Sequence, residues 1–201
     1  MLALIAPGQG SQTPGMLLPW IANPSNAELL GQWSDAIDLD LLHLGTRADA
    51  EEIRDTANAQ PLIVAAGLLS AGALELEGKF SCVAGHSVGE ITAASLAGVI
   101  TPVDALRLVR VRGLEMAKAA AASPSGMSAV LGGDREVVLK AIADAGLVAA
   151  NDNGGGQLVI SGSKAAVEKA AALATEKGAK RAIMLPVSAP FHSDLMAPAA
   201  H

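Results

Sequence analysis

The sequence of 201 residues predicts an α/β fold with a parallel sheet, accompanied by a smaller α+β subdomain. Three observations support this prediction. Over residues 1–122, short apolar runs alternate with helical stretches, which is typical of parallel strands covered by helices. A Gly-x-Ser-x-Gly sequence at 85–89 joins a strand-like stretch to a helical one. After a Pro- and Gly-containing break at 122–126, a second pattern of strands and helices begins.

The elements of the first stretch follow from its apolar pattern and its turn residues. The continuous apolar run Leu2–Ala6 predicts a buried parallel strand, and the segment Pro7–Gln12 predicts a sharply turning loop. Thr101 is a suitable N-cap and Pro102 suits the first helical position, so we expect a helix from there to about Ala121. The remaining expected elements are helices at Asp49–Ile53, Ala59–Leu74 and Glu90–Ala97 and a strand at Phe80–Ala84.

The second pattern predicts a compact subdomain with the order β-α-β-β-α-β, which is the ferredoxin-like order. We expect this subdomain at 123–185, inserted into or appended to a larger subdomain formed by 1–122 and 186–201. Its expected strands are Met127–Leu131, Leu147–Ala150, Gln157–Ser161 and Arg181–Leu185, and its expected helices are Asp134–Ala145 and Lys164–Lys177.

Ser87, at the centre of the Gly-x-Ser-x-Gly sequence, is the candidate nucleophile. A strand, a sharp turn and a helix are the context in which this pattern forms a nucleophile elbow, and Gly85 and Gly89 leave room for the strained backbone. The serine oxygen would then lie at a helix N-terminus, where N–H groups can stabilise an oxyanion. The alternative is a chance pattern in a chain with 21 glycines, and the flanking strand and helix favour the nucleophile.

A nucleophilic serine needs a base, and the chain offers four histidines: His43, His86, His192 and His201. His86 adjoins the serine, and neighbours on an elbow point in different directions. His43 lies in a stretch of mixed character, and His201 is the terminal residue. His192 follows a strand in a rigid turn, and we expect it to be the base. No acid is well placed to orient it, so a Ser/His dyad is predicted.

Arg112 is expected to bind an anion. At about 100° per residue, Arg112 falls on the apolar face of its helix, with Ala105, Leu108, Val109 and Met116, while Arg107, Arg110 and Lys118 fall opposite. A buried guanidinium is costly unless it meets an anion, so a clamp on a substrate carboxylate is predicted. The alternative is an internal ion pair, with Glu115 or with a distant Asp.

Composition and charge exclude several classes of function. The net charge is −6 with no long basic run, and the chain has no tyrosine, which argues against nucleic-acid binding. The N-terminus does not read as a signal peptide, and Leu62–Leu74 is too short to span a bilayer, so no membrane and a cytoplasmic location are expected. The histidines lack ligand spacing, so no metal is expected. Cys82 is expected to be a buried, inert thiol.

Four motifs occur in order along the chain: Gln9 within Gly8–Gln12, the segment Gly85–Glu90, Arg112-Gly113, and Pro190-Phe191-His192-Ser193. Together they resemble the malonyl-CoA:acyl carrier protein transacylase family, to which the acyltransferase domains of fatty acid and polyketide synthases are similar. The resemblance covers the whole chain and is strongest toward stand-alone bacterial enzymes of actinobacterial type. It implies an α/β-hydrolase-like large subdomain with a parallel sheet and a nucleophile elbow, plus an inserted ferredoxin-like α+β small subdomain.

The resemblance also implies roles for individual residues. Ser87 would be acylated by malonyl-CoA, and His192 would first remove and then return the proton. The main-chain N–H groups of Gln9 and Val88 would form the oxyanion hole, and Arg112 would hold the free carboxylate of malonate. The residues implied near the pocket are Gln60, Asn153, Phe191 and His86. A bulky residue at 191 would leave little room for a 2-methyl branch.

The implied partners are malonyl-CoA, as the coenzyme A thioester substrate, and acyl carrier protein, whose phosphopantetheine thiol accepts the malonyl group in fatty acid synthesis. Within the same family, an acyltransferase of polyketide synthesis is the alternative. No cofactor is expected, and the expected state is a monomer. Members of the family continue beyond the point where this chain stops, and that part orients the catalytic histidine. The chain is therefore expected to lack the C-terminal third and to be weakly active or inactive.

Two other functions are compatible with the sequence. A serine hydrolase would share the elbow but release the acyl group to water; the predicted buried arginine and the absent third member favour transfer. A non-catalytic docking module could instead bind an acidic carrier protein through a basic excess in the stretch 164–181. That stretch contains Lys164, Lys169, Lys177, Lys180 and Arg181 against Glu168 and Glu176.

Overall fold

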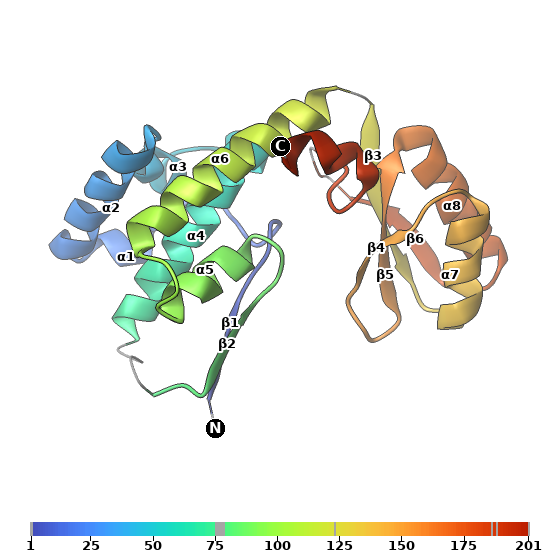
Figure 1. Ribbon diagram of the computed structural model, residues 1–201, viewed down its shortest axis with the longest axis horizontal. Coiled ribbons are helices and arrows are strands. Elements are labelled where there is room, and N and C mark those ends of the chain that lie inside the picture. Colours follow the sequence, from blue (N-terminus) through green and yellow to red (C-terminus); the bar gives the residue numbers. More distant parts are fainter. Residues whose placement is uncertain (1, 75–78, 123, 186, 188, 201) are drawn as a thin grey trace. The chain divides into compact units, whose positions relative to one another are not determined.

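The computed structural model describes residues 2–74, 79–122, 124–185, 187 and 189–200. It contains two compact units, Met1–Leu114 and Glu115–His201, and the division falls inside helix α6 (Pro102–Ala121) (Figure 1). The expected boundaries at 122/123 and 185/186 stay a prediction, and Ser123, Pro186 and His201 lie outside the described residues. Each unit is described by itself below.

The first unit combines a parallel pair of strands with several helices. Its strands are β1 (Ala3–Ala6) and β2 (Cys82–Gly85), and its helices are α1 (Leu18–Ile21), α2 (Pro24–Ile37), α3 (Leu41–Thr46), η1 (Glu52–Arg54), α4 (Thr56–Ala73), α5 (Gly89–Leu96) and the first part of α6. The predicted strands and the helices that correspond to α4, α5 and α6 are present, with ends shifted by a few residues, whereas the helix expected at Asp49–Ile53 is only the 3-10 turn η1. The helices α1 to α3 were not predicted, although Asn23 caps α2 by accepting from the Ser25 N–H and Pro24 occupies its first position.

Strands β1 and β2 pair in parallel, with Ala3 opposite Cys82 and Ala6 opposite Gly85. Burial alternates along both strands, because α5 packs against the pair. The open side carries exposed side chains, including Ile5, which is 70% exposed, and Cys82, so the expectation of a buried strand at Leu2–Ala6 was wrong. The prediction of a buried thiol at Cys82 was therefore wrong: the position was correctly assigned to a strand, but the residue falls on the open side of the pleat.

The core of the first unit is built around α4, which is buried on most sides. Its apolar residues between Leu62 and Leu69 pack with Leu17, Leu30, Trp33 and Leu106. Pro61 lies inside this helix and cannot donate to the carbonyl four residues earlier, that of Ala57. The Arg110 Nη1 of α6 donates to that carbonyl at 3.1 Å. A neighbouring helix therefore supplies the hydrogen bond that Pro61 cannot donate.

The second unit has the predicted β-α-β-β-α-β order. Its elements are the end of α6, β3 (Ser125–Leu131), α7 (Arg135–Asp144), β4 (Ala149–Asp152), β5 (Gln157–Ser163), α8 (Lys164–Glu176), β6 (Arg181–Met184) and η2 (Asp194–Ala200). The sheet is antiparallel in the order β4-β5-β3-β6, with Ala129 opposite both Val159 and Ile183. Both helices pack on the sheet, and Val138, Ile142, Ile160 and Val167 fill the space between them. The prediction of an α/β fold with a ferredoxin-like second part is confirmed.

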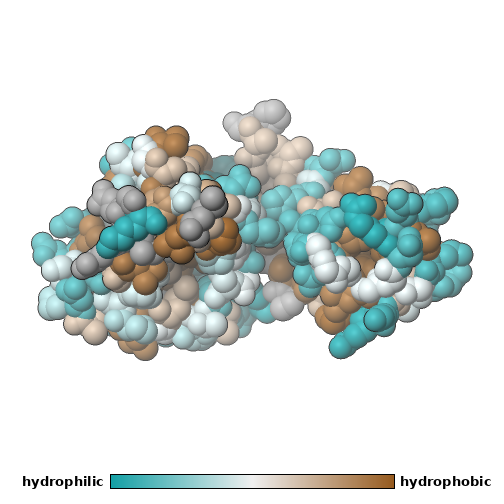
Figure 2. All heavy atoms as spheres, turned by 90° about the horizontal axis from the view of Figure 1, so that it is seen from below, coloured by the Kyte–Doolittle hydropathy of each residue, from teal (hydrophilic) through white to brown (hydrophobic). Residues whose placement is uncertain are grey.

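The surface shows no large uniform region of one character on the face seen in Figure 2, where hydrophobic and hydrophilic residues are interspersed. The most exposed large apolar side chains among the described residues are Val99, Ile5 and Val148. In the part of the chain that the structure describes, none of the helices combines the length and the apolar character that crossing a bilayer requires.

Candidate functional site

Ser87 occupies a tight turn between β2 and α5, and its φ of 53° places it in the left-handed region. Glycines make this turn sterically feasible. A Cβ on Gly85 would lie 2.1 Å from the carbonyl carbon of Gly89, and a Cβ on Gly89 would lie 2.4 Å from the Ala6 carbonyl oxygen. The predicted strand, sharp turn and helix are all present, and a strained serine backbone between two such glycines is the geometry of a nucleophile elbow.

The main chain after Ser87 winds tightly into α5. The Gly89, Glu90 and Ile91 N–H groups donate to carbonyls three residues earlier, at 3.0, 3.0 and 3.1 Å. Val88, at the N-cap position of α5, is buried. The Ser87 side chain therefore stands at the positive end of a helix dipole, where developing negative charge is favoured.

The loop after β1 approaches the elbow closely. The His86 N–H donates to the Ala6 carbonyl at 3.0 Å, which joins the elbow to the end of β1. A Cβ on Gly8 would lie 2.5 Å from His86 Nδ1 and 2.9 Å from its carbonyl oxygen, so glycine is required at this approach. His86 itself is exposed.

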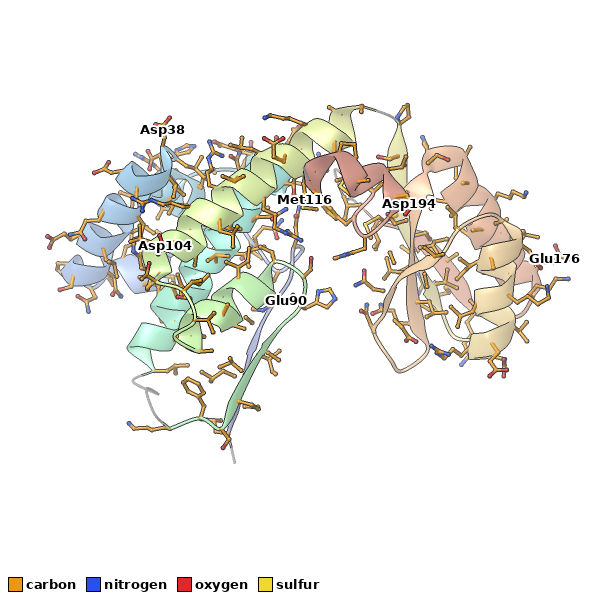
Figure 3. The ribbon with its side chains drawn as sticks, in the orientation of Figure 1. Asp38, Glu90, Asp104, Met116, Glu176 and Asp194 are labelled. Carbon is orange, nitrogen blue, oxygen red and sulfur yellow. The ribbon has the colours of Figure 1, made fainter. Side chains whose placement is uncertain are left out.

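Arg112 reaches from α6 to the elbow. Its Nη2 donates to Ser87 Oγ at 3.3 Å, and its Nη1 donates to Gln60 Oε1. Burial lowers the pKa of the guanidinium, while the negative charge of Glu90, at the start of α5 (Figure 3), acts in the opposite direction. An arginine stays charged at neutral pH under such a shift, so a cation lies beside the serine oxygen.

The helical face assigned to Arg112 is only partly correct. Ala105 and Val109 are fully buried as expected, but Leu108 is 52% exposed. Arg110, assigned to the solvent face, is half-buried and bonds to α4. These differences arise because α6 packs on α4. The residues of α6 that are buried are those that contact α4, and this contact line does not coincide with the apolar face predicted from the sequence. The pairing with Glu115 that was weighed as an alternative is not the one observed: Glu115 pairs with Lys118 at 2.6 Å.

Gln9 and Gln60 are joined through Thr56. The Thr56 hydroxyl donates to Gln9 Oε1 at 2.9 Å and accepts from Gln60 Nε2 at 2.9 Å. Thr56 and Gln60 are both fully buried. A continuous set of hydrogen bonds therefore runs from the loop after β1 through the first turns of α4 to Arg112 and Ser87.

Three of the predicted site residues lie in the second unit. His192 follows Phe191 in a turn, has a φ of 56° and is exposed; the Ser193 hydroxyl closes this turn by donating to the Pro190 carbonyl at 2.7 Å. Phe191 is buried in a cluster with residues such as Met127. Asn153 belongs to the β4–β5 hairpin, where its side chain donates to Gln157 Oε1 at 2.9 Å.

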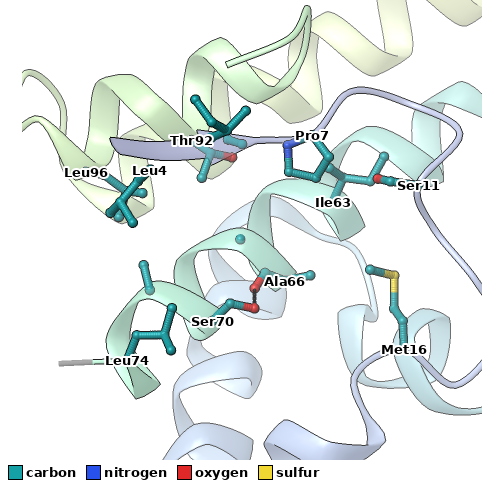
Figure 4. Close-up of a pocket in the computed structure, with 14 residues that line it drawn as sticks. Leu4, Pro7, Ser11, Met16, Ile63, Ala66, Ser70, Leu74, Thr92 and Leu96 are labelled. Atoms are coloured by element: carbon teal, nitrogen blue, oxygen red, sulfur yellow. Dashed lines mark hydrogen bonds between the residues drawn. The ribbon is translucent and has the colours of Figure 1, made fainter. Parts of the chain in front are cut away.

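The first unit also contains a histidine–glutamate pair and an apolar cavity. His43 pairs with Glu52 at 3.0 Å. Among the described residues, no group of three His, Cys, Asp or Glu side chains could hold a metal ion. An apolar cavity of about 260 Å³ lies among β1, α4 and α5, and Figure 4 shows residues that line it, including Leu4, Ile63 and Leu96. Its lining includes neither Ser87 nor Arg112 and carries no charged side chain, so it is separate from the elbow.

Sequence reasoning missed Thr56 and the role of Arg110. Thr56 is the first residue of α4, after the N-cap Asp55, whose side chain accepts from the Ala57 N–H. The spacing of four between Thr56 and Gln60 places both on one helix face, which is a signal that the sequence contained. The helix predicted from Ala59 put Pro61 in its first turn, where a missing N–H breaks no intrahelical bond; only the observed start of α4 at Thr56 leaves the Ala57 carbonyl without its helical donor.

Comparison with known proteins identifies the family. Residues 4–201 match the family model described as acyl transferase domain. The malonyl CoA-acyl carrier protein transacylase of Mycobacterium tuberculosis (strain H37Rv) is 54% identical over 203 residues, covering 99% of this chain and 67% of the relative. The chain therefore spans about two thirds of the length of this relative.

Solved structures agree with this match. The crystal structure of MCAT from Mycobacterium tuberculosis superposes with a TM-score of 0.91 at 53% identity, covering 98% of this chain and 66% of that one. A type II PKS acyl-carrier protein in complex with its malonyl-transacylase gives a TM-score of 0.91 at 37% identity, with the same coverage of both chains. The resemblance drawn from the four motifs is confirmed: the chain belongs to the acyl transferase family, among relatives named malonyl CoA-acyl carrier protein transacylases.

Proposed function

We propose that this chain transfers a malonyl group from malonyl-CoA to the phosphopantetheine thiol of acyl carrier protein in fatty acid synthesis, through a malonyl ester of Ser87. The position of Arg112 is the observation that carries the proposal. Its guanidinium lies 3.3 Å from Ser87 Oγ, so a carboxylate held there would place the other end of a three-carbon acyl group beside the nucleophile.

In the first half of the reaction, Ser87 Oγ attacks the thioester carbonyl of malonyl-CoA while His192 takes the hydroxyl proton. The carbonyl oxygen becomes an oxyanion, which the main-chain N–H groups of Gln9 and Val88 stabilise. The C–S bond then breaks, and His192 returns the proton to the departing coenzyme A thiolate. The product of this half is a malonyl ester on Ser87.

In the second half, the phosphopantetheine thiol of the carrier protein loses its proton to His192 and attacks the ester carbonyl. The C–O bond to Ser87 breaks, and the proton passes to the serine oxygen. Every step is an acyl or proton transfer between these groups, so the proposal includes no cofactor or metal. We further propose a cytoplasmic monomer, with Phe191 restricting the extender unit and Gln60, His86 and Asn153 lying near the pocket.

Intact-protein mass spectrometry tests the proposal. Mixing the chain with malonyl-CoA should add one malonyl group, peptide mapping should place it on Ser87, and Ser87→Ala should abolish it. Adding acyl carrier protein should then move the label to the carrier thiol. Loss of the label to water, with none on the carrier, would indicate a serine hydrolase. Carrier binding without acylation of Ser87 would indicate a docking module.

A further inference from the structure

Thr56 is a buried hydroxyl placed between two amide side chains that belong to different parts of the candidate site. One is Gln9, in the loop proposed to supply an oxyanion-hole N–H, and the other is Gln60, which accepts from Arg112. The 2.9 Å distances on both sides give a satisfied hydroxyl with one bond donated and one accepted. None of the roles described above uses this residue.

The direction of these hydrogen bonds is fixed by the charge of Arg112. A guanidinium only donates, so the Gln60 oxygen must face it and the Gln60 NH₂ group must face Thr56. The Thr56 hydroxyl then accepts from Gln60, and its single proton points to the Gln9 oxygen. The orientation of the Gln9 side chain is therefore set, through two intermediates, by the guanidinium.

The loop that carries Gln9 has a second attachment to the same region. Gln12 Nε2 donates to the Ile53 carbonyl at 3.2 Å, and Gln12 Oε1 accepts from the Gly10 N–H at 2.8 Å. Ile53 lies in η1, just before α4, and Thr56 is the first residue of α4, so the loop is held at two points on one short segment. Motion of that segment would move the loop with it.

Helix α6 packs on the same segment. A Cβ on Gly113 would lie 3.0 Å from the Thr56 carbonyl oxygen and 3.2 Å from Ala57 Cα, so the backbones of α6 and the first turn of α4 pack closely at this point. Arg112, next to this glycine, thus shares a rigid frame with Thr56.

We propose that Thr56 is a positioning residue that couples the oxyanion loop to the carboxylate-binding arginine. The catalytic role given to Thr56 in this inference rests on the proposed function. Its hydroxyl transmits the orientation of Arg112 and Gln60 to Gln9, so that the carboxylate site and the oxyanion site keep a fixed separation. Removing the hydroxyl should disturb both sites together, although Thr56 itself is buried.

Three variants separate this role from a packing role. Thr56→Val keeps the shape and removes the hydroxyl, and Thr56→Ser keeps the hydroxyl. Thr92→Val is the matched control, because Thr92 is a buried helical threonine of the same unit whose hydroxyl has no hydrogen-bond partner among the described residues.

Two chemical measurements then test the oxyanion loop and the carboxylate site separately. The rate at which an uncharged fluorophosphonate labels Ser87 reports the oxyanion loop, and the ratio of malonyl to acetyl transfer from their coenzyme A thioesters reports Arg112. We expect Thr56→Val to lower the labelling rate about tenfold and the ratio about fivefold, the scale of one or two lost hydrogen bonds. Thr56→Ser and Thr92→Val should stay within about twofold of the parent chain in both.

Several outcomes would overturn the inference. One is a Thr56→Val chain that melts at a lower temperature but keeps its labelling rate and its ratio, and another is a fall in only one of the two readouts. A parent chain that reacts with the fluorophosphonate but takes no malonyl group would instead reject the proposed function, and the labelling rates would still test the loop.

Hydrogen–deuterium exchange of a peptide covering 7–12 measures the mobility of the oxyanion loop and so tests the coupling without any acyl transfer. Faster exchange in Thr56→Val alone supports it, and unchanged exchange rejects it.

Discussion

Replacing Arg112 tests the assignment of the carboxylate site most directly. In Arg112→Ala, a malonyl group loses its charged hydrogen bonds, each worth about 1.5–3 kcal/mol. One such bond corresponds to about a 10- to 150-fold loss, since 1.4 kcal/mol is a factor of ten. Acetyl-CoA has no free carboxylate and should lose far less. The ratio of malonyl to acetyl transfer should therefore fall by about 10- to 150-fold.

The structure also predicts a cost in stability that the assay must separate from the chemistry. Arg112→Ala removes the donor to the Oε1 atom of Gln60, an amide that is fully buried, and about 1–3 kcal/mol of unfolding free energy should be lost. Transfer should be measured well below the melting temperature of the variant. Arg107→Ala is the matched control, because Arg107 lies on the same helix with 62% of its side chain exposed.

Competition between malonyl-CoA and acetyl-CoA for Ser87, followed by intact-protein mass spectrometry, measures the ratio in one reaction. Arg112→Lys should give an intermediate ratio, because lysine keeps the charge but not the planar fork of donors. Equal losses for the two acyl groups in Arg112→Ala would refute the reasoning. The hydrogen bond to Ser87 would then serve only to hold the serine side chain.

Three further predictions concern stability. Gly85→Ala should cost about 3 kcal/mol or more of unfolding free energy in a denaturant titration, since the new Cβ would lie 2.1 Å from the main chain of the elbow. Arg110→Met should cost about 1–2 kcal/mol in the same titration, because it removes the donor to the α4 carbonyl that proline leaves unmet. The hydrogen bond from Arg135, followed by that from the Gly154 N–H, lowers the pKa of Asp152. A lowered folded pKa gives stability that is present above the unfolded value of about 4 and is lost as the pH falls through the folded value, so Arg135→Met should destabilise more at pH 6 than at pH 2.

Each of these predictions has a control or a contradicting result. Gly31→Ala in α2, where a new Cβ meets nothing within 4 Å, should instead stabilise by about 0.5–1 kcal/mol. Arg107→Met should change stability by less than about 0.5 kcal/mol, and an equal effect of Arg110→Met would contradict the assigned bond. A destabilisation by Arg135→Met that is the same at both pH values would show that the ion pair does not contribute.

Much of the fold could be predicted because its signals are local. The helix α6 begins where Thr101 and Pro102 indicated, and the Thr101 hydroxyl accepts from the Asp104 N–H at 3.1 Å. The alternation of strands and helices in the second unit likewise follows from periodicity. The helices α1 and α3 escaped prediction because they have only four and six residues, whereas α2 carried signals that were not used: the Asn23 cap, Pro24, and apolar residues at 30, 33 and 37.

The exposure of individual side chains was less predictable. Cys82 was placed in the right strand and given the wrong environment, because the strand pattern does not say which side of the pleat a helix covers. Leu108 was placed on the buried face of α6, yet the line of contact with α4 leaves it exposed. In both cases the secondary structure was correct and the direction of packing decided the outcome.

By itself, the sequence determined the elbow around Ser87, the order of elements in the second unit and, through four short motifs, the family, because each motif or element consists of residues that are adjacent or regularly spaced. Only the tertiary structure showed that Arg112, Gln60, Thr56 and Gln9 form one set of hydrogen bonds ending at the serine. These residues come from a loop and two helices far apart in the chain. Their alignment requires α6 to pack against the start of α4, which is a property of the folded core and of no local pattern.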